Sequence, residues 1–217
     1  MSLTIFDLDN TLISDDSDHL WGEFLVEKKL VDGDEYATAN TQFYNDYCQG
    51  KLDIDEYLRF ALSFLAEHPI EKLHQWREQF VNEKIRPLVL PAAQKLVEKH
   101  RNNGDTLMVI TATNRFVTEP IVKLFGIPTM LATEPELIDG RYTGQYIDEP
   151  CYQEGKVSRL TNWLANSNID LSNSTFYSDS HNDIPLLNKV THPVAVDPDE
   201  QLKHHAIEHN WSIITLR

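Results

Sequence analysis

Two aspartates separated by one residue follow the first apolar run of the chain. The run begins at Leu3, and Asp7 and Asp9 close it. In an extended chain, side chains two residues apart leave the same face, so the two carboxylates are expected to lie together. Like charges that close need a counter-ion, and Mg²⁺ is the hard cation that prefers oxygen ligands. Taken alone, an Asp-x-Asp sequence is also typical of a solvated turn.

Other metals fit this pair of acids less well. The surrounding sequence has no cysteine and no pair of histidines, which argues against zinc. A calcium-binding loop counted from Asp7 would need glycine at its sixth position, and that position is Leu12. Mg²⁺ is therefore the predicted metal.

More polar residues fall where later strands are expected to end. Thr111 closes a strand that begins at Leu107, Asp179 closes another, and Asp183 follows in the next loop or helix start. Lys156 opens a helix directly after Gly155. Each alone has an ordinary interpretation, as a helix cap, a turn or an exposed lysine. In an open parallel sheet, however, the carboxyl ends of the strands share one edge, where ligands bind.

The elements that must position these residues alternate between strand and helix from residue 88 onward. An amphipathic helix is predicted from Ala92 to Asn103, and a further helix ends at Gly126, with Pro120 in its first turn. Asp139-Gly140 predicts a hairpin within residues 136–146. The predicted fold is α/β, with a doubly wound, mainly parallel sheet.

Residues 15–87 have a different pattern and are predicted to be helical throughout. The clearest helix starts after Asp53 and carries apolar residues at spacings of three and four until Pro69 stops it. We expect an α/β core made of residues 1–14 and 88–217, and an inserted all-helical cap made of residues 15–87. Gly22, Gly50 and the segment 87–91 are candidate hinges.

Composition excludes several classes of protein. The 217 residues include 34 Asp and Glu against 19 Lys and Arg, a formal net charge of −15. That charge disfavours nucleic acid and anionic membranes as partners, and no stretch has the length of a membrane span. Cys48 and Cys151 do not make a disulfide framework. We expect a cytoplasmic protein with reduced thiols, and nothing here predicts its oligomeric state.

The motifs, taken in order, resemble the haloacid dehalogenase superfamily. Residues 7–12, Asp-Leu-Asp-Asn-Thr-Leu, are similar to its first motif, and Thr111, Lys156 and residues 178–183 are similar to the second, third and fourth. The resemblance covers essentially the whole chain. One departure is Ser178, where the fourth motif often has glycine; we expect little consequence beyond reduced backbone freedom.

The resemblance implies a rossmannoid core and an Mg²⁺-dependent phosphatase. Asp7 would attack phosphorus and form an aspartyl-phosphate, and Asp9 would act as general acid and then general base. The metal ligands implied are Asp7, the Asp9 carbonyl, Asp179 and, through water, Asp183. The groups implied to hold the phosphoryl oxygens are Thr111, the Ala112 amide, Lys156 and Asn182.

The helical insertion resembles the cap of the subgroup that includes phosphoserine phosphatase, and bacterial histidinol-phosphatase-like members are the more similar. This implies a small-molecule phosphomonoester as substrate, with phosphoserine and histidinol phosphate as candidates. Asp16 and Asp18 at the cap entry would bind a cationic amine or imidazolium. The alternative is a solvated acidic loop in an acidic protein.

Three other functions share part of this pattern. A phosphotransferase or phosphomutase of the same superfamily can carry all four motifs. A receiver domain of two-component signalling also uses Asp, Thr, Lys and Mg²⁺, but it is shorter and has no helical insertion. A non-catalytic phosphate-binding domain is disfavoured because Asp9 is present.

Overall fold

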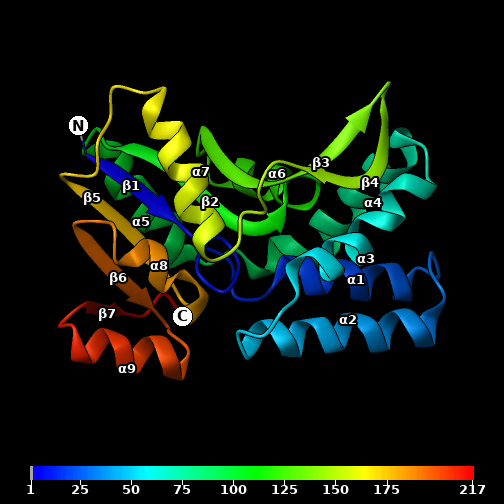
Figure 1. Ribbon diagram of the computed structural model, residues 1–217, viewed down its shortest axis with the longest axis horizontal. Helices are drawn as coiled ribbons and strands as arrows, with labels where there is room; N and C mark the ends of the chain where they lie inside the picture. The colour runs from blue at the N-terminus through cyan, green and yellow to red at the C-terminus, as the bar shows by residue number, and fades with distance from the viewer. Residues whose placement is uncertain (1) are drawn as a thin grey trace.

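The computed structural model describes residues 2–217 and contains one seven-stranded sheet in the order β4-β3-β2-β1-β5-β6-β7. Every neighbouring pair is parallel except β3 and β4. Figure 1 shows strands β1, β5, β6 and β7 at the left, with both chain ends, while β3 and β4 extend to the right beside the inserted helices. The strands are β1 Leu3–Phe6, β2 Thr106–Asn114, β3 Thr129–Ile138, β4 Arg141–Ile147, β5 Ser174–Ser178, β6 His192–Val196 and β7 Ser212–Ile214.

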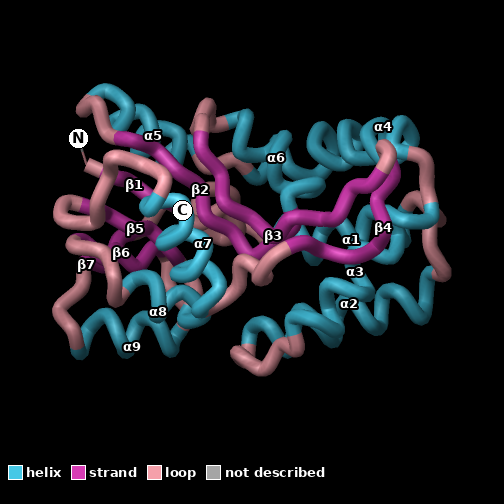
Figure 2. Tube along the Cα trace, turned by 45° about the horizontal axis from the view of Figure 1, so that its top comes forward, coloured by secondary structure: helices cyan, strands magenta, loops and turns pink. Residues whose placement is uncertain are grey.

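Helices cover both faces of the sheet, as predicted for a doubly wound fold (Figure 2). In the insertion the α-helices are α1 Ser17–Glu27, α2 Gly33–Cys48, α3 Ile54–Glu67 and α4 Ile70–Phe80, followed by the π-helix η1 Val81–Ile85. In the core they are α5 Pro91–Asn102, α6 Arg115–Leu124, α7 Glu154–Ala165, α8 Ile184–Leu187 and α9 Glu200–Glu208. Short 3₁₀ turns, η2 Arg86–Leu88 and η3 His181–Asp183, lie beside them.

The central strand β1 is buried on both faces, and its residues divide between two apolar clusters. Leu3 and Ile5 pack with the inner sides of α7, α8 and α9, whereas Phe6 packs with α5, α6 and the helices of the insertion. Alternation along the strand sends successive side chains to opposite faces. This accounts for the continuous apolar run at the start of the sequence.

The helical insertion leaves and re-enters the core at one point. Ile13 and Val89 form an antiparallel bridge, and the Ser14 amide donates to the Leu88 carbonyl at 3.0 Å. The predicted boundaries of the cap fall at this bridge, and the division into core and cap stays a prediction. The β3–β4 hairpin lies outside the insertion in the sequence, yet it packs on α3 (Figure 1). The Tyr146 hydroxyl of this hairpin donates to Asp55 Oδ1 of α3 at 2.5 Å.

Three local predictions are wrong. Pro120 is the sixth residue of α6, because Asn114 caps that helix and starts it earlier than expected. Strand β2 continues past Thr111 to Asn114, although its regular pairing with β3 breaks after Ile110. Gly22 is not a hinge: it lies inside α1 and packs against the Asn40 side chain of α2.

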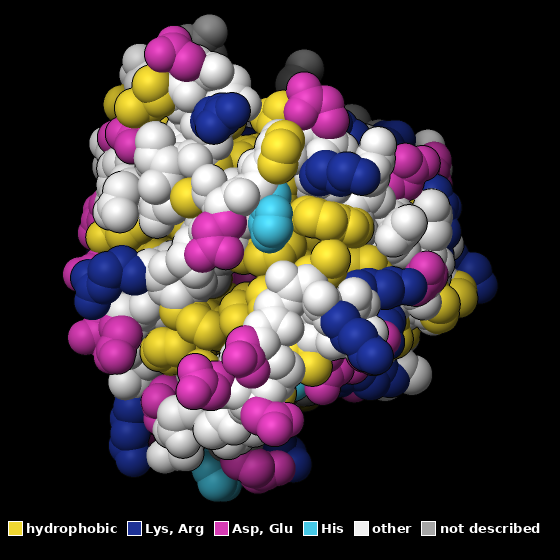
Figure 3. Space-filling model, turned by 90° about the vertical axis from the view of Figure 1, so that its right-hand side faces the viewer, with side chains coloured by type: hydrophobic (Ala, Val, Ile, Leu, Met, Phe, Trp, Pro, Cys, Tyr) yellow, Lys and Arg dark blue, Asp and Glu magenta, His cyan; other side chains and the backbone are white. Residues whose placement is uncertain are grey.

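The surface mixes charges of both signs with apolar side chains. Figure 3 shows this mixture on the side of the molecule that carries the helical insertion. Exposed large apolar residues include Leu137 and Ile138 at the tip of the β3–β4 hairpin and Ile147 near its end. Among the described residues, no helix combines the length and the apolar character that a membrane span requires.

Candidate active site

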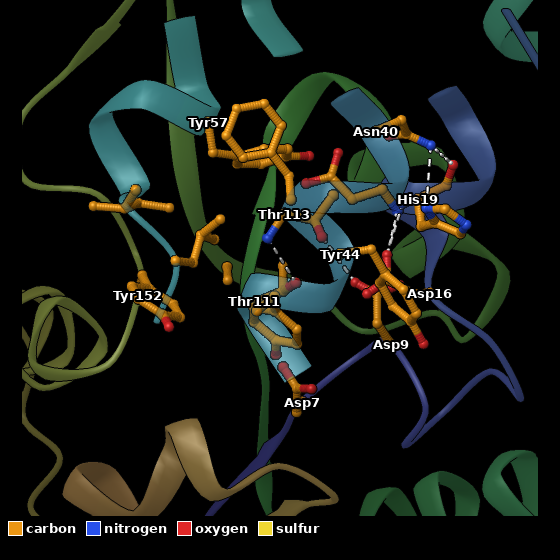
Figure 4. Close-up of a pocket in the computed structure, with 16 residues that line it drawn as sticks. Asp7, Asp9, Asp16, His19, Asn40, Tyr44, Tyr57, Thr111, Thr113 and Tyr152 are labelled. Carbon is orange, nitrogen blue, oxygen red and sulfur yellow. Dashed lines mark hydrogen bonds between the residues drawn. The ribbon is translucent and has the colours of Figure 1, made fainter. Parts of the chain in front are cut away.

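A cavity lies between the carboxyl edge of the sheet and helices α1, α2 and α3 (Figure 4). It joins the segment after β1 and the end of β2 to the inner sides of the inserted helices. The polar and charged residues that line it are Asp7, Asp9, Asp16, Asp18, His19, Asn40, Thr111 and Thr113. The other lining residues are Phe43, Tyr44, Tyr47, Leu52, Ile54, Tyr57, Ala112 and Tyr152.

Asp7 forms a buried ion pair at the base of this cavity. Lys156 Nζ lies 2.9 Å from Asp7 Oδ1 and 2.7 Å from Asp183 Oδ1, and all three residues are almost wholly buried. The Ser178 hydroxyl donates to Asp183 Oδ2 at 2.7 Å. The side chain at the position where the motif often has glycine therefore orients Asp183, a contact that the sequence did not predict.

The position of Lys156 depends on a close backbone approach next to it. Helix α7 begins at Glu154, two residues earlier than predicted, so Lys156 is its third residue. A β-carbon on Gly155 would collide with the Pro150 carbonyl oxygen, which only glycine avoids. Gly155 thus lets the preceding loop fold against the helix start, and Lys156 then reaches Asp7.

Asp9 is held by two hydrogen bonds from different parts of the chain. The Ser17 amide at the start of α1 donates to Asp9 Oδ1 at 2.8 Å, and the Thr113 hydroxyl donates to Oδ2 at 2.9 Å. Both donors and the carboxylate are buried. The structure thus brings Asp7 and Asp9 to one cavity, as predicted, with a fixed orientation for each.

Burial changes the acidity of these groups. Desolvation, reinforced by the charges of Asp183 and Asp9 and opposed by Lys156, raises the pKa of Asp7 to about 7. Desolvation and the charge of Asp16 raise the pKa of Asp9 to about 7, against its hydrogen bonds. Burial alone would lower the pKa of Lys156, but the charges of Asp183 and Asp7 raise it above its ordinary value.

Asp179 follows β5 and adds a further carboxylate beside Asp7. The Thr11 hydroxyl donates to Asp179 Oδ1 at 2.8 Å. Burial and the charges of Asp7 and Asp183 raise the pKa of Asp179 well above its ordinary value. Lys156 pairs with Asp7 and Asp183, whereas Asp179 has no lysine or arginine partner among the described residues. This donor set fits a hard divalent ion.

The number of side-chain ligands also decides which ion would fit. Within residues 2–217 no three His, Cys, Asp or Glu side chains are arranged around one point as metal ligands. Mg²⁺ commonly takes one or two carboxylates and completes its shell with water and substrate oxygens. Asp7 and Asp179 with a backbone carbonyl fit that pattern.

Thr111 and Ala112 line the cavity where the pairing of β2 with β3 is interrupted. The Thr111 hydroxyl accepts from the Thr113 amide at 3.3 Å, and Ala112 accepts from the Thr133 hydroxyl through its carbonyl at 3.0 Å. The irregular backbone between Ile110 and Asn114 therefore exposes a hydroxyl and a peptide to the cavity.

Asn182 is buried, but it does not line the cavity. Its amide nitrogen donates to the Tyr47 carbonyl at the end of α2, at 3.1 Å, and its oxygen accepts from Tyr152 and Gln153. In this arrangement the predicted phosphate-binding amide joins the core to the inserted helices.

Asp16 and Asp18 line the cavity from the start of α1. Asp16 is the N-cap residue, and its Oδ1 accepts from the amides of Asp18 and His19 at 3.0 and 2.8 Å. Desolvation, with the charges of neighbouring acids, raises the pKa of both carboxyls to about 7. The Tyr57 hydroxyl partly opposes that shift at Asp18.

Several residues of the site were missed by sequence reasoning. Thr113 could have been found from its place two residues after Thr111 in an irregular strand end. His19, Asn40, Tyr44 and Tyr57 come from three helices, and their helical spacing indicates packing rather than a site. Nothing in the sequence shows which helix faces the carboxylates.

Comparison with known proteins agrees with this geometry. Residues 4–188 match the family model described as haloacid dehalogenase-like hydrolase. A Neisseria meningitidis protein named histidinol-phosphatase is 45% identical, covering 100% of this chain and 99% of the relative. A Mycobacterium tuberculosis protein named phosphoserine phosphatase is 30% identical, covering 98% of this chain and 70% of that protein.

Solved structures give the same result for the fold. A Bordetella pertussis protein of unknown function is 40% identical and superposes with a TM-score of 0.93, covering 100% of this chain and 99% of the other. A phosphoserine phosphatase, solved as an analogue of its phospho-aspartyl intermediate, is 20% identical with a TM-score of 0.73, covering 100% and 93%. The family resemblance of the motifs is confirmed: this chain belongs to the haloacid dehalogenase-like hydrolases, as one of their phosphatases.

Proposed function

We propose that the chain hydrolyses small phosphomonoesters through an aspartyl-phosphate on Asp7. The observation that carries this proposal is the convergence of Asp7 and Asp9 on one cavity, with Lys156 bound to Asp7. Asp7 Oδ1 is oriented by that ammonium, which leaves its other oxygen for in-line attack on phosphorus. The ester P–O bond breaks as the carboxylate–phosphorus bond forms.

Asp9 is proposed as the general acid and then the general base. A carboxyl with a pKa raised to about 7 exists in both protonation states near neutral pH, as a group that gives and then takes a proton must. It would protonate the departing alkoxide and later deprotonate the water that cleaves the acyl phosphate. Thr113 and the Ser17 amide would hold its orientation in both steps.

The phosphoryl oxygens would be held by groups at the irregular end of β2 and by the lysine. Thr111 and Ala112 line the cavity and would donate through the Thr111 hydroxyl and the Ala112 amide, and Lys156 would supply the positive charge. Fixed donors of this kind stabilise charge that develops in the transition state. Asn182 would contribute only if its bond to Tyr47 opened.

Mg²⁺ is the proposed cofactor, held by Asp7, the Asp9 carbonyl and Asp179, with Asp183 acting through water. When bound, it would offset the charge of a phosphate dianion in a site rich in carboxylates. Ser178 and Lys156 would keep Asp183 in place.

The leaving group would lie against Asp16 and Asp18. The buried carboxylate of Asp16 and the half-buried carboxylate of Asp18 favour a leaving group with a positive charge. The names of the Neisseria and Mycobacterium relatives make histidinol phosphate and phosphoserine the first candidates.

The test is phosphate release from a panel of phosphomonoesters, with Mg²⁺ and with EDTA. The panel includes histidinol phosphate, phosphoserine, sugar phosphates and p-nitrophenyl phosphate. We expect Mg²⁺-dependent release that Asp7→Asn abolishes and that Asp9→Asn slows by about 10²–10⁴-fold. Asp139→Asn, at the exposed hairpin turn, is the matched control and should keep full activity.

Acid quenching during turnover should trap phosphate on the wild-type chain and none on Asp7→Asn. Full turnover by Asp7→Asn would reject Asp7 as the nucleophile. Phosphate that appears on an added alcohol in place of water would identify a phosphotransferase.

A further inference from the structure

The inserted helices present negative charge and aromatic rings to the cavity, and no free cation. Of the 16 residues that line it within the described chain, four are aspartates and none is lysine or arginine. Lys156 lies beneath the cavity, with its ammonium bound to Asp7 and Asp183. The half of the cavity that would hold a leaving group therefore has no basic side chain except the imidazole of His19.

The Asn40 side chain of α2 holds the His19 ring in place. The Asn40 amide nitrogen donates to the His19 carbonyl at 2.9 Å, and this bond fixes which end of the amide faces the ring. The same nitrogen lies 3.1 Å from His19 Nδ1, so the Asn40 side chain contacts both the backbone and the ring of His19. Gly22 makes this possible, because any β-carbon there would overlap the Asn40 side chain.

The acids, in contrast, have acceptor capacity to spare. Asp16 uses Oδ1 to cap α1, while its Oδ2 accepts no hydrogen bond within residues 2–217. Asp18 lies two residues further along the same turn. Around them stand Tyr44, stacked on His19 with ring centroids 4.5 Å apart, and Tyr57 (Figure 4). Carboxylates flanked by aromatic faces are suited to an organic ammonium ion.

We propose that this pocket accepts phosphomonoesters of amino alcohols and rejects phosphomonoesters of amino acids. The inference rests on the proposed phosphatase function and narrows its substrate class. An ammonium group would neutralise Asp16 and Asp18. A carboxylate on the same carbon would enter beside them, and none of the described residues that line the cavity is a lysine or arginine to pair with it. An unpaired buried charge is strongly disfavoured. Histidinol phosphate is in the accepted class and phosphoserine in the rejected one.

A matched set of three esters tests this proposal. O-phosphoethanolamine and O-phosphoserine differ by one carboxylate, and ethyl phosphate lacks the ammonium group as well. We expect kcat/KM for phosphoethanolamine to exceed that for phosphoserine at least tenfold, and to exceed that for ethyl phosphate. Equal or better use of phosphoserine would overturn the proposal.

Variants tie the selectivity to the named acids. Asp16→Asn and Asp18→Asn should bring both ratios toward one, because the change removes attraction for ammonium and repulsion of carboxylate. Asn is as good an N-cap as Asp, so Asp16→Asn keeps the start of α1. Asp15→Asn is the matched control: Asp15 does not line the cavity, and the ratios should stay within about twofold of wild type. Unchanged ratios in both test variants would reject the role of these acids.

A binding measurement separates this inference from the phosphatase proposal. The dissociation constants of phosphoethanolamine and phosphoserine for Asp7→Asn, by titration calorimetry, should show the same preference without turnover. If none of the three esters is hydrolysed but the preference in binding remains, the phosphatase proposal fails and the inference survives. If ethyl phosphate is hydrolysed and no preference appears in either measurement, the inference alone fails.

Discussion

At the scale of single residues, Asp16 has two opposite effects on stability. Its Oδ1 caps α1, which stabilises the helix start. Burial raises its pKa from an ordinary 3.8 to about 7, so the native state binds a proton more readily than the unfolded chain. Stability contributed by this group is therefore complete at low pH and is lost as pH rises from about 4 through about 7.

Because the buried charge of Asp16 costs stability at high pH, its removal should stabilise the protein there. Asp16→Asn keeps the cap and removes the buried charge, so at pH 8 it should raise the free energy of unfolding by about 1–3 kcal/mol. The gain should shrink toward zero near pH 4. Urea denaturation at several pH values, in EDTA, measures it.

Asp53→Asn is the matched control, because Asp53 caps α3 in the same way but is exposed. It should change stability little at any pH. A gain for Asp16→Asn that is equal at pH 4 and pH 8 would contradict the argument from burial.

Residue types and spacing predicted the carboxylate side of the site. Asp7, Asp9, Thr111, Lys156, Asp179 and Asp183 come together because parallel strands share one carboxyl edge, which order along the chain reveals. The spacing could not predict Asn182, whose amide meets Tyr47 only after the insertion has folded onto the core. His19 and Asn40 were missed for the same reason, since their meeting depends on how α1 and α2 cross.

At the scale of elements, the contact of α1 with α2 depends on one glycine. Gly22 allows Asn40 to lie against α1 and reach His19, and a β-carbon would stand 2.5 Å from Asn40 Cγ. In an open helix, Gly→Ala stabilises by about 1 kcal/mol. Here the overlap should reverse that sign.

We predict that Gly22→Ala lowers the free energy of unfolding by about 1–3 kcal/mol, the usual cost of overpacking. It should also weaken selectivity for the leaving group, because Asn40 can no longer hold His19. Gly33→Ala is the matched control: it lies at the start of α2, where a β-carbon would meet only Val26 Cγ1 at 3.9 Å. Thermal unfolding of the two variants side by side measures the difference, and equal melting temperatures would contradict it.

Element type was predicted better than element limits. Apolar periodicity indicated the helix after Asp53 and the alternation from residue 88, because packing of an apolar face requires that pattern. Helix starts depend on caps, which sequence shows poorly: Asn114 begins α6 six residues before Pro120. The pairing of β4 with β3 was predicted from Asp139-Gly140, but its packing on α3 is a contact that no local pattern contains.

At the scale of the whole molecule, the turn after α2 meets the loop after β5 directly over the candidate site. Gly50 has φ +67°, and a β-carbon there would stand 2.7 Å from His181 Nε2. Beside it the Asn182 amide donates to the Tyr47 carbonyl at 3.1 Å. These contacts, like the Ile13–Val89 bridge, join the insertion to the rest of the chain, so we expect them to limit opening of the cavity.

We predict that Gly50→Ala opens this contact. The methyl group should push the turn from the loop after β5, and kcat/KM should fall about tenfold as the cavity admits water. Trypsin should cleave faster after Lys51, which is exposed in the same turn.

Gly104→Ala separates this effect from backbone strain, because Gly104 has φ +77° with no atom within 4 Å of a β-carbon. Both variants should lose about 1–2 kcal/mol of stability from strain alone, so only a loss of activity confined to Gly50→Ala supports closure. Equal loss in both would show that strain, and not the contact with His181, is the cause.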